Sequence, residues 1–145
     1  MKKQIILLLA LALGLIGLAI WIYAPMYRHN QMAKEYMKQL SNAPLDKRDK
    51  LCDKYLSIGL LCGNGNHCDI LCTTFWQSDI PLQKLRAVES KYKVIFVTDE
   101  DALSHFYEDF PSVKGVVQST LRLKNCTYIL VDWKSFMPDG DLRCY

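Results

Sequence analysis

The amino terminus carries a long uncharged apolar segment, which constrains the fold more than any other part of the sequence. Lys2 and Lys3 are followed by twenty-four residues without a charged side chain, from Gln4 to Tyr27. About 20 apolar residues in a helix span the hydrocarbon core of a bilayer. A cleaved secretory signal also begins in this way, but its apolar core is shorter, roughly 7–15 residues. We therefore predict a transmembrane signal-anchor helix over residues 1–27, with a cleaved signal as the alternative.

The cysteines indicate the compartment of the rest of the chain. All of them follow the apolar segment: Cys52, Cys62, Cys68, Cys72, Cys126 and Cys144. Lys2, Lys3 and the amino terminus balance Arg28, Lys34 and Lys38, so charge leaves the orientation of the segment open. Disulfides accumulate in oxidising compartments, and an even cysteine count beyond a secretion-type segment is typical of a disulfide framework. We expect a single-pass protein of the inner (cell) membrane with an extracytoplasmic, most simply periplasmic, carboxyl-terminal domain.

Residues 61–72, LCGNGNHCDILC, form the densest cluster of reactive side chains. Zinc accepts cysteine and histidine ligands, but Cys62 and Cys68 are spaced too widely for a usual zinc pattern, and His67 directly precedes Cys68. A thiol-disulfide oxidoreductase would use Cys68 and Cys72, although three residues separate them instead of the two of a thioredoxin-type site. In one helical turn these two cysteines share a face without bonding to each other. Structural disulfides to different partners are the favoured reading.

Six cysteines allow 15 pairings, so the sequence leaves the connectivity open. We expect Cys52, Cys62, Cys68 and Cys72 to pair among themselves. A bridge between Cys126 and Cys144 would then tie the carboxyl-terminal tail to the domain.

Residues 28–44 predict a juxtamembrane amphipathic helix that ends before Pro44. Its apolar residues recur at helical spacing and form one stripe: Met32, Ala33, Tyr36, Met37 and Leu40. Two interpretations stay open. The stripe docks onto the domain or the membrane surface, or Met32, Tyr36, Met37 and Leu40 form a face for a partner helix.

Residues 45–145 predict one extracytoplasmic α+β domain. We expect helices over 45–58, 78–92 and 99–110, a buried strand over 93–98, and a hairpin of strands 113–124 and 126–133. Residues 72–77 are a candidate further strand. The predicted fold is therefore a transmembrane helix followed by a small disulfide-stabilised domain, with a three- or four-stranded sheet and helices on one face.

Two further polar features have structural explanations. The acidic run from Asp99 to Asp101 lies where a helix begins, and carboxylates there are stabilised by the helix dipole. His105 lies on the polar face of the same helix, where a pH-responsive site is the alternative to a solvated surface. A net charge of +3 without a basic stripe gives no indication of nucleic-acid binding.

No catalytic motif, cofactor motif or metal motif is recognised, so we predict that the protein is not an enzyme. The predicted function is to bind or stabilise another membrane or envelope protein, as an accessory subunit or co-regulator. One alternative is an immunity-type inhibitor of a toxin in the same compartment. The other is the oxidoreductase that uses Cys68 and Cys72.

Overall fold

The computed structural model describes residues 2–43, 45, 50–59, 61, 67–77, 82–137 and 140–144. Helix α1 (Lys2–Ser41) is followed by strands β1 (Lys50–Gly59) and β2 (Cys68–Gln77), helix α2 (Leu82–Glu89) and strand β3 (Lys93–Phe96). Helix α3 (Glu100–Asp109), the 3-10 turn η1 (Pro111–Val113), helix α4 (Lys114–Leu123), strand β4 (Tyr128–Phe136) and the 3-10 turn η2 (Leu142–Cys144) complete the described elements.

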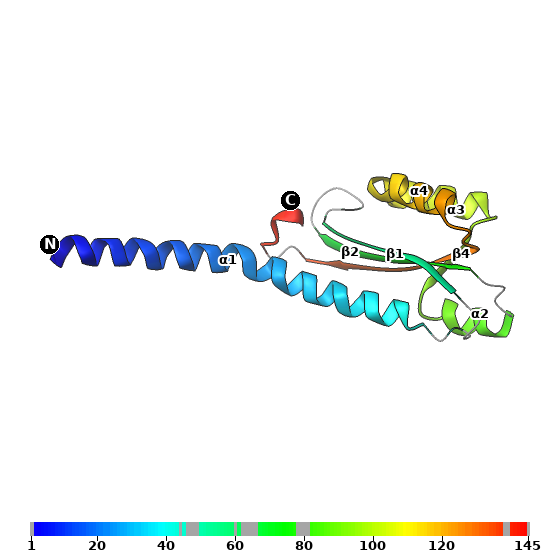
Figure 1. The fold of residues 1–145 in the computed structure, drawn as a ribbon, viewed down its shortest axis with the longest axis horizontal. Helices are drawn as coiled ribbons and strands as arrows, with labels where there is room; N and C mark the ends of the chain where they lie inside the picture. Colours follow the sequence, from blue (N-terminus) through cyan, green and yellow to red (C-terminus); the bar gives the residue numbers. More distant parts are fainter. Residues whose placement is uncertain are drawn as a thin grey trace.

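Helix α1 is one continuous helix that has two environments. Its 40 residues give a length of about 60 Å at 1.5 Å per residue, roughly twice a bilayer core. The amino-terminal half extends away from the domain with bare apolar side chains, and the second half lies along the sheet (Figure 1). By length and composition, α1 is apolar enough to cross a membrane.

The four strands form one antiparallel sheet in the order β1-β2-β4-β3. β2 and β4 are the central strands and pair along their full length, from Cys68 opposite Phe136 to Trp76 opposite Tyr128. β1 lies at one edge, and the short β3 lies at the other, pairing only with residues 128–131 of β4. This confirms the predicted α+β class and a strand that includes residues 72–77. The predicted strand over 93–98 is confirmed for residues 93–96, whereas residues 97 and 98 form a turn.

Helices cover both faces of the sheet, so the expectation of helices on one face is wrong (Figure 1). β2 is buried on both faces, which allows its alternate side chains to build two cores. One core joins Phe75, Ile129 and Val131 to α3 and α4, through Phe106 and Val117. The other core joins the opposite face of β2 and β4 to α1 and α2. The sheet is therefore the middle layer of three.

The predicted helix over 45–58 is wrong for its described part, because residues 50–59 form β1. The pairing of β1 with β2 shifts register between Leu51 and Asp53, which makes Cys52 the extra residue of a β-bulge. The bulge turns Cys52 and Tyr55 toward the same core, although they are three positions apart. A bulged strand thus reproduced the apolar spacing of a helix.

The predicted hairpin is wrong as well, because residues 114–123 form α4 and β4 pairs with β2 and β3 instead. Val113, Val117 and Leu121 all contact the core, and a spacing of four fits both a strand and a helix. Leu123, which the strand would bury, is 82% exposed. The helix over residues 99–110 is confirmed by α3. The described part of the predicted helix over 78–92 is confirmed by α2, while residues 78–81 lie outside the described residues.

Candidate functional site

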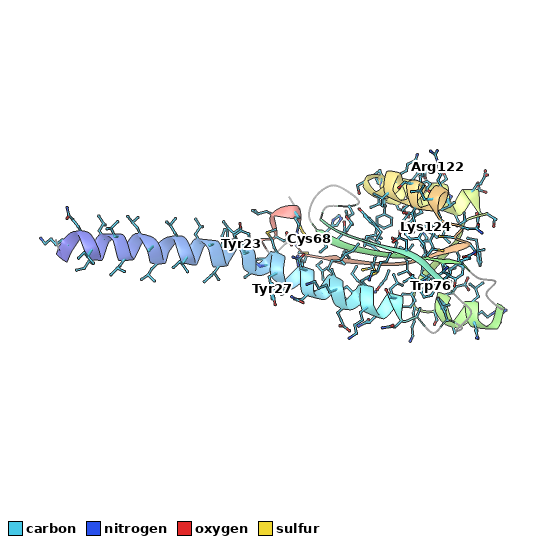
Figure 2. The ribbon with its side chains drawn as sticks, viewed as in Figure 1. Tyr23, Tyr27, Cys68, Trp76, Arg122 and Lys124 are labelled. Carbon is cyan, nitrogen blue, oxygen red and sulfur yellow. A yellow bond between two sulfur atoms is a disulfide. The ribbon has the colours of Figure 1, made fainter. Side chains whose placement is uncertain are left out.

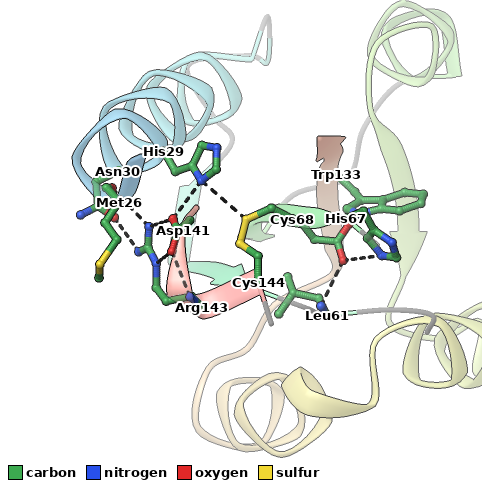
Figure 3. The surroundings of a disulfide bond; sticks show 11 residues. Met26, His29, Asn30, Leu61, His67, Cys68, Trp133, Asp141, Arg143 and Cys144 are labelled. Atoms are coloured by element: carbon green, nitrogen blue, oxygen red, sulfur yellow. Dashed lines mark hydrogen bonds and ion pairs between the residues drawn. A yellow bond between two sulfur atoms is a disulfide. The ribbon is translucent and has the colours of Figure 1, made fainter. Parts of the chain in front are cut away.

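A concentrated group of buried polar side chains lies where α1 meets the domain. Cys68 at the start of β2 forms a disulfide with Cys144 in η2, with 4.8 Å between the two Cα atoms (Figures 2 and 3). His29 of α1 lies against this bond, with its Nδ1 atom 3.6 Å from Cys68 Sγ. We call His29, Cys68, Asp141, Arg143 and Cys144 the neck cluster.

Asp141 is the centre of the hydrogen bonds in the neck cluster and is fully buried. Its carboxylate lies 2.9 Å from His29 Nδ1, and Arg143 donates to it from Nε at 2.9 Å and from the backbone N–H at 3.0 Å. Hydrogen bonds from Arg143 hold the pKa of the Asp141 carboxyl well below its usual range, and the bond from His29 adds to this effect. An ionised carboxylate only accepts hydrogen bonds, so Nδ1 of His29 carries the proton that is shared with Asp141.

Arg143 extends the same network onto the backbone and side chains of α1. It donates from Nη1 to Asn30 Oδ1 at 2.7 Å and from Nη2 to the Met26 carbonyl at 3.2 Å (Figure 3). The tail is thus joined to α1 through Arg143 and Asp141, and to β2 through the disulfide. Charge-assisted hydrogen bonds of this kind are about twice as strong as neutral ones.

The neck cluster also contains residue types that bind metals. Ligand atoms of His29, Cys68, Asp141 and Cys144 all lie within 4.8 Å of one another and are buried. Zinc requires cysteine as a thiolate, however, and both sulfurs are joined in the disulfide. Arg143 also places a positive charge on the carboxylate that a cation would use. The geometry therefore fits a structural fastening better than a metal centre.

Asp69 is a second buried carboxylate, one residue after Cys68. It accepts hydrogen bonds from the Leu61 backbone N–H at 3.0 Å and from Trp133 Nε1 at 3.0 Å, and it lies 3.1 Å from His67 Nε2 (Figure 3). Successive residues of a strand point to opposite faces, so Asp69 lies on the sheet face away from α1. His67, which the sequence offered as a zinc ligand without favouring it, pairs with this carboxylate.

Cys68 and Cys72 are not bonded to each other, which confirms that part of the sequence prediction. The assumed helical turn is wrong, because both lie in β2, where four residues span about 13 Å. Cys72 is a buried thiol whose Sγ donates to the Ala33 carbonyl at 3.8 Å. Burial raises its pKa to about 12, so it stays protonated at neutral pH and is a poor nucleophile.

The other cysteines have different outcomes. Both expected pairings are wrong. Cys68 bonds to Cys144, 76 positions away in sequence, and so neither pairs within the group from Cys52 to Cys72 nor leaves Cys144 for Cys126. Cys52 and Cys126 are thiols, yet their side chains are hydrogen-bonded to each other, and Cys52 Sγ lies 3.9 Å from the Asn125 carbonyl. Burial and the bond with Cys52 raise the pKa of Cys126 to about 12. Cys62 lies outside the described residues.

The apolar stripe of the juxtamembrane region packs on the sheet. Ala33, Met37 and Leu40 are buried in the core on the α1 side, and Met32 and Tyr36 pack against it. These contacts match the interpretation in which the stripe docks onto the chain's own domain. The contacts therefore do not favour a partner-helix role for this face.

The acidic run and His105 take the structural roles expected of them. Asp99 caps α3 by accepting a hydrogen bond from the Ala102 backbone N–H at 2.9 Å. His105 is exposed, with its Nδ1 atom 3.5 Å from Glu108 Oε2 on the same helix.

Sequence reasoning missed His29, Asp141 and Arg143. His29 lies on the helix next to the predicted anchor, and the other two residues lie in the short tail, more than 110 positions away. No spacing pattern connects segments that far apart. The only available indication was Cys144 itself, since a cysteine in a tail predicts that the tail is fastened to another element.

Comparison with known proteins gives no relative from which a role could be carried over. No protein-family model, curated protein or solved structure matches the chain. Its function therefore has to be inferred from its own residues and their geometry.

Proposed function

We propose that this chain is a single-span, membrane-anchored, non-catalytic protein whose extracytoplasmic domain binds or stabilises another envelope protein, as an accessory subunit or co-regulator. The observation that carries the proposal is the division of α1. Its first half is bare and apolar, and its second half is built into the domain.

The bare half of α1 needs an apolar environment. Its leucine and isoleucine side chains between Ile5 and Ile20 are more than half exposed. Each such side chain gains about 1.5–3 kcal/mol when it leaves water, so a lipid core stabilises this segment strongly. Trp21 follows as an exposed aromatic residue, as do Tyr23 and Tyr27, which are labelled in Figure 2. Tryptophan and tyrosine gather at the bilayer surface, which puts that surface next to the aromatic group.

The neck cluster begins where this aromatic group ends, since Met26 and His29 contact the tail. The domain is therefore held close to the membrane surface by a helix that is continuous with the anchor. A disulfide in the cluster is consistent with an oxidising, extracytoplasmic side. A domain held at a fixed height and orientation suits contact with a neighbouring membrane protein.

The oxidoreductase alternative has less support. Cys68 is bonded to Cys144, and Cys72 is a distant, buried and protonated thiol. An immunity-type inhibitor would use the same anchor helix and neck cluster. Identifying the bound protein would distinguish such an inhibitor from an accessory subunit.

Membrane fractionation of the full chain tests the anchor. Wild type should stay in the membrane pellet after alkaline extraction. A variant with arginine at Leu9, Leu13 and Ile16 should move to the soluble fraction. Each arginine at the centre of a span costs about 2.5–3.5 kcal/mol, and three together outweigh the about 0.3–0.6 kcal/mol that each remaining leucine or isoleucine contributes to insertion. The control is Leu123→Arg, since Leu13 is 69% exposed in α1 and Leu123 is 82% exposed in the domain. Equal release of the two variants, or a soluble wild type, would contradict the anchor.

Orientation and binding need separate measurements. Protease added outside the inner membrane should digest the domain, while a protected domain would contradict the extracytoplasmic placement. Purification from detergent with α1 retained should yield a defined complex with another envelope protein. A monomer that shows enzymatic turnover would overturn the non-catalytic role.

A further inference from the structure

The sheet has an open edge on β4. β2 pairs with β4 as far as Phe136, but β3 pairs with β4 only as far as Val131. In the described part of the chain, no strand lies beside residues 132–136 on the β3 side, and we call this stretch the open edge. An unpaired edge presents backbone N–H and C=O groups that can pair with another extended chain.

A groove of about 430 Å³ lies at this edge, between the end of α3, the start of β3 and β4. Phe110 and Trp133 give it aromatic walls, and Lys91, Lys93 and Lys134 line it with amino groups. The same place thus offers backbone pairing, an apolar contact and positive charge.

Trp133 is held firmly although it is 46% exposed. Its Nε1 atom donates to the buried carboxylate of Asp69 at 3.0 Å. Its ring meets the Phe110 ring edge-on, with 5.6 Å between centroids. A fixed, half-exposed tryptophan loses little conformational entropy on binding, and such residues are common hot spots of protein interfaces.

The charge of the groove selects the kind of partner. Lys93 lies 3.6 Å from Asp109, and Lys134 lies 3.1 Å from Asp132. Among the described residues, none forms an ion pair with Lys91, so three lysines face two aspartates and leave one positive charge in excess. Complementary charge favours an acidic segment and speeds its association.

The open edge lies at the end of β4 that meets α1. Phe136 stacks against His29 and Tyr36, with 6.2 Å and 6.5 Å between ring centroids. Since His29 belongs to the neck cluster, this end is the part of β4 closest to the proposed membrane surface. A segment that enters here would come from a protein in the same membrane.

We propose that the groove binds an extended acidic segment of a partner membrane protein, which adds as a strand beside residues 132–136 of β4. An apolar side chain of that segment contacts Phe110 and Trp133, and its carboxylates pair with Lys91 and the neighbouring lysines. Strand addition of this kind takes affinity from main-chain hydrogen bonds and specificity from alternate side-chain contacts. This inference rests on the proposed function and assigns it a surface and a partner chemistry.

Two synthetic peptides with capped ends test the proposal against full-length protein in detergent micelles. One alternates glutamate with threonine and valine around a central phenylalanine, and the other has lysine at every glutamate position. Binding is followed by tryptophan fluorescence, with Trp133→Phe identifying the signal of Trp133. The acidic peptide should bind saturably and at least tenfold more tightly than the basic one. Equal affinity of the two peptides would overturn the proposal.

Charge reversal locates the site. Lys91→Glu should weaken the acidic peptide about tenfold, and the effect should shrink at high salt because exposed charges are screened. Arg122→Glu on α4 is the matched control, an equal charge change at an exposed residue outside the groove, and should leave affinity unchanged (Figure 2). Equal weakening by both variants would show that only net charge matters and would contradict the proposal.

Hydrogen exchange tests the strand pairing directly. Saturating acidic peptide should slow exchange of backbone amides in residues 132–136 and leave those of α4 unchanged. Absence of this protection would exclude strand addition even if the peptide binds. Failure here is distinct from failure of the proposed function, because a chain that still purifies with an envelope protein would be binding it elsewhere.

Discussion

Loss of the disulfide between Cys68 and Cys144 should be the most damaging single change in the domain. The two residues are 76 positions apart, and the loop-closure entropy for a loop of this length gives about 4.5 kcal/mol at 25 °C. Domains of this size are stable by only about 5–15 kcal/mol, so the bond is a large part of the total. The same bond holds Asp141 and Arg143 against α1, so its loss also frees the tail.

The measurement is urea unfolding of the full chain in detergent micelles, with Cys68→Ala, Cys144→Ala and the double variant. Each single variant removes the whole bond, so the double variant should lie within about 0.5 kcal/mol of either single one. Cys72→Ala is the matched control, because Cys72 is as buried as Cys68, lies on the same face of β2 and forms no disulfide. The reasoning is refuted if Cys68→Ala costs no more than Cys72→Ala, or if a reductant leaves wild-type stability unchanged.

Four further outcomes follow from the structure. The folded state lowers the pKa of Asp141, so its contribution to stability should be complete above pH about 4 and be lost as pH falls through the lowered pKa. In Asp141→Asn, acid titration of the unfolding free energy should lack this dependence. Cys72, with its pKa raised to about 12, should resist alkylation at pH 8 until the protein is unfolded, which mass spectrometry of labelled peptides can show. Oxidised glutathione should convert the contacting thiols of Cys52 and Cys126 to a disulfide, with release of two equivalents of reduced glutathione; a mixed disulfide on either cysteine alone would contradict that contact. Gly59→Ala should destabilise the domain by about 1–3 kcal/mol, because Gly59 has φ +148° and its new Cβ would lie 2.9 Å from a backbone oxygen of η2; thermal unfolding measures this.

Part of the candidate site was predictable because cysteine chemistry is visible in the sequence. The even count and the position after the apolar segment indicated disulfides, and Cys68 is indeed bonded. The partner was not predictable, because pairing depends on which segments the sheet brings together. Placing Cys68 at the start of β2 beside the end of β4 puts it next to the tail that follows β4.

The open edge could not be foreseen either. It exists because β3 has four residues and β4 has nine, and strand lengths in a sheet are known only once the register is known. The sequence showed Trp133 merely as an aromatic residue at the end of an apolar strand. The tertiary structure adds the hydrogen bond from Trp133 to Asp69, which holds the partly exposed ring in place.

Local and compositional features of this protein follow from its amino-acid sequence alone. A continuous apolar segment forms a helix, the capping carboxylate of Asp99 begins another, and the short apolar run at residues 93–96 forms a strand, as its composition predicts. The tertiary structure sets the secondary structure of β1 and α4, whose apolar spacing fits both a strand and a helix. Only the neighbouring elements determine which of these two structures buries more apolar surface. The tertiary structure also decided that the stripe on α1 faces the sheet and that His29 meets Asp141, since contacts across so many residues depend on the whole chain being folded.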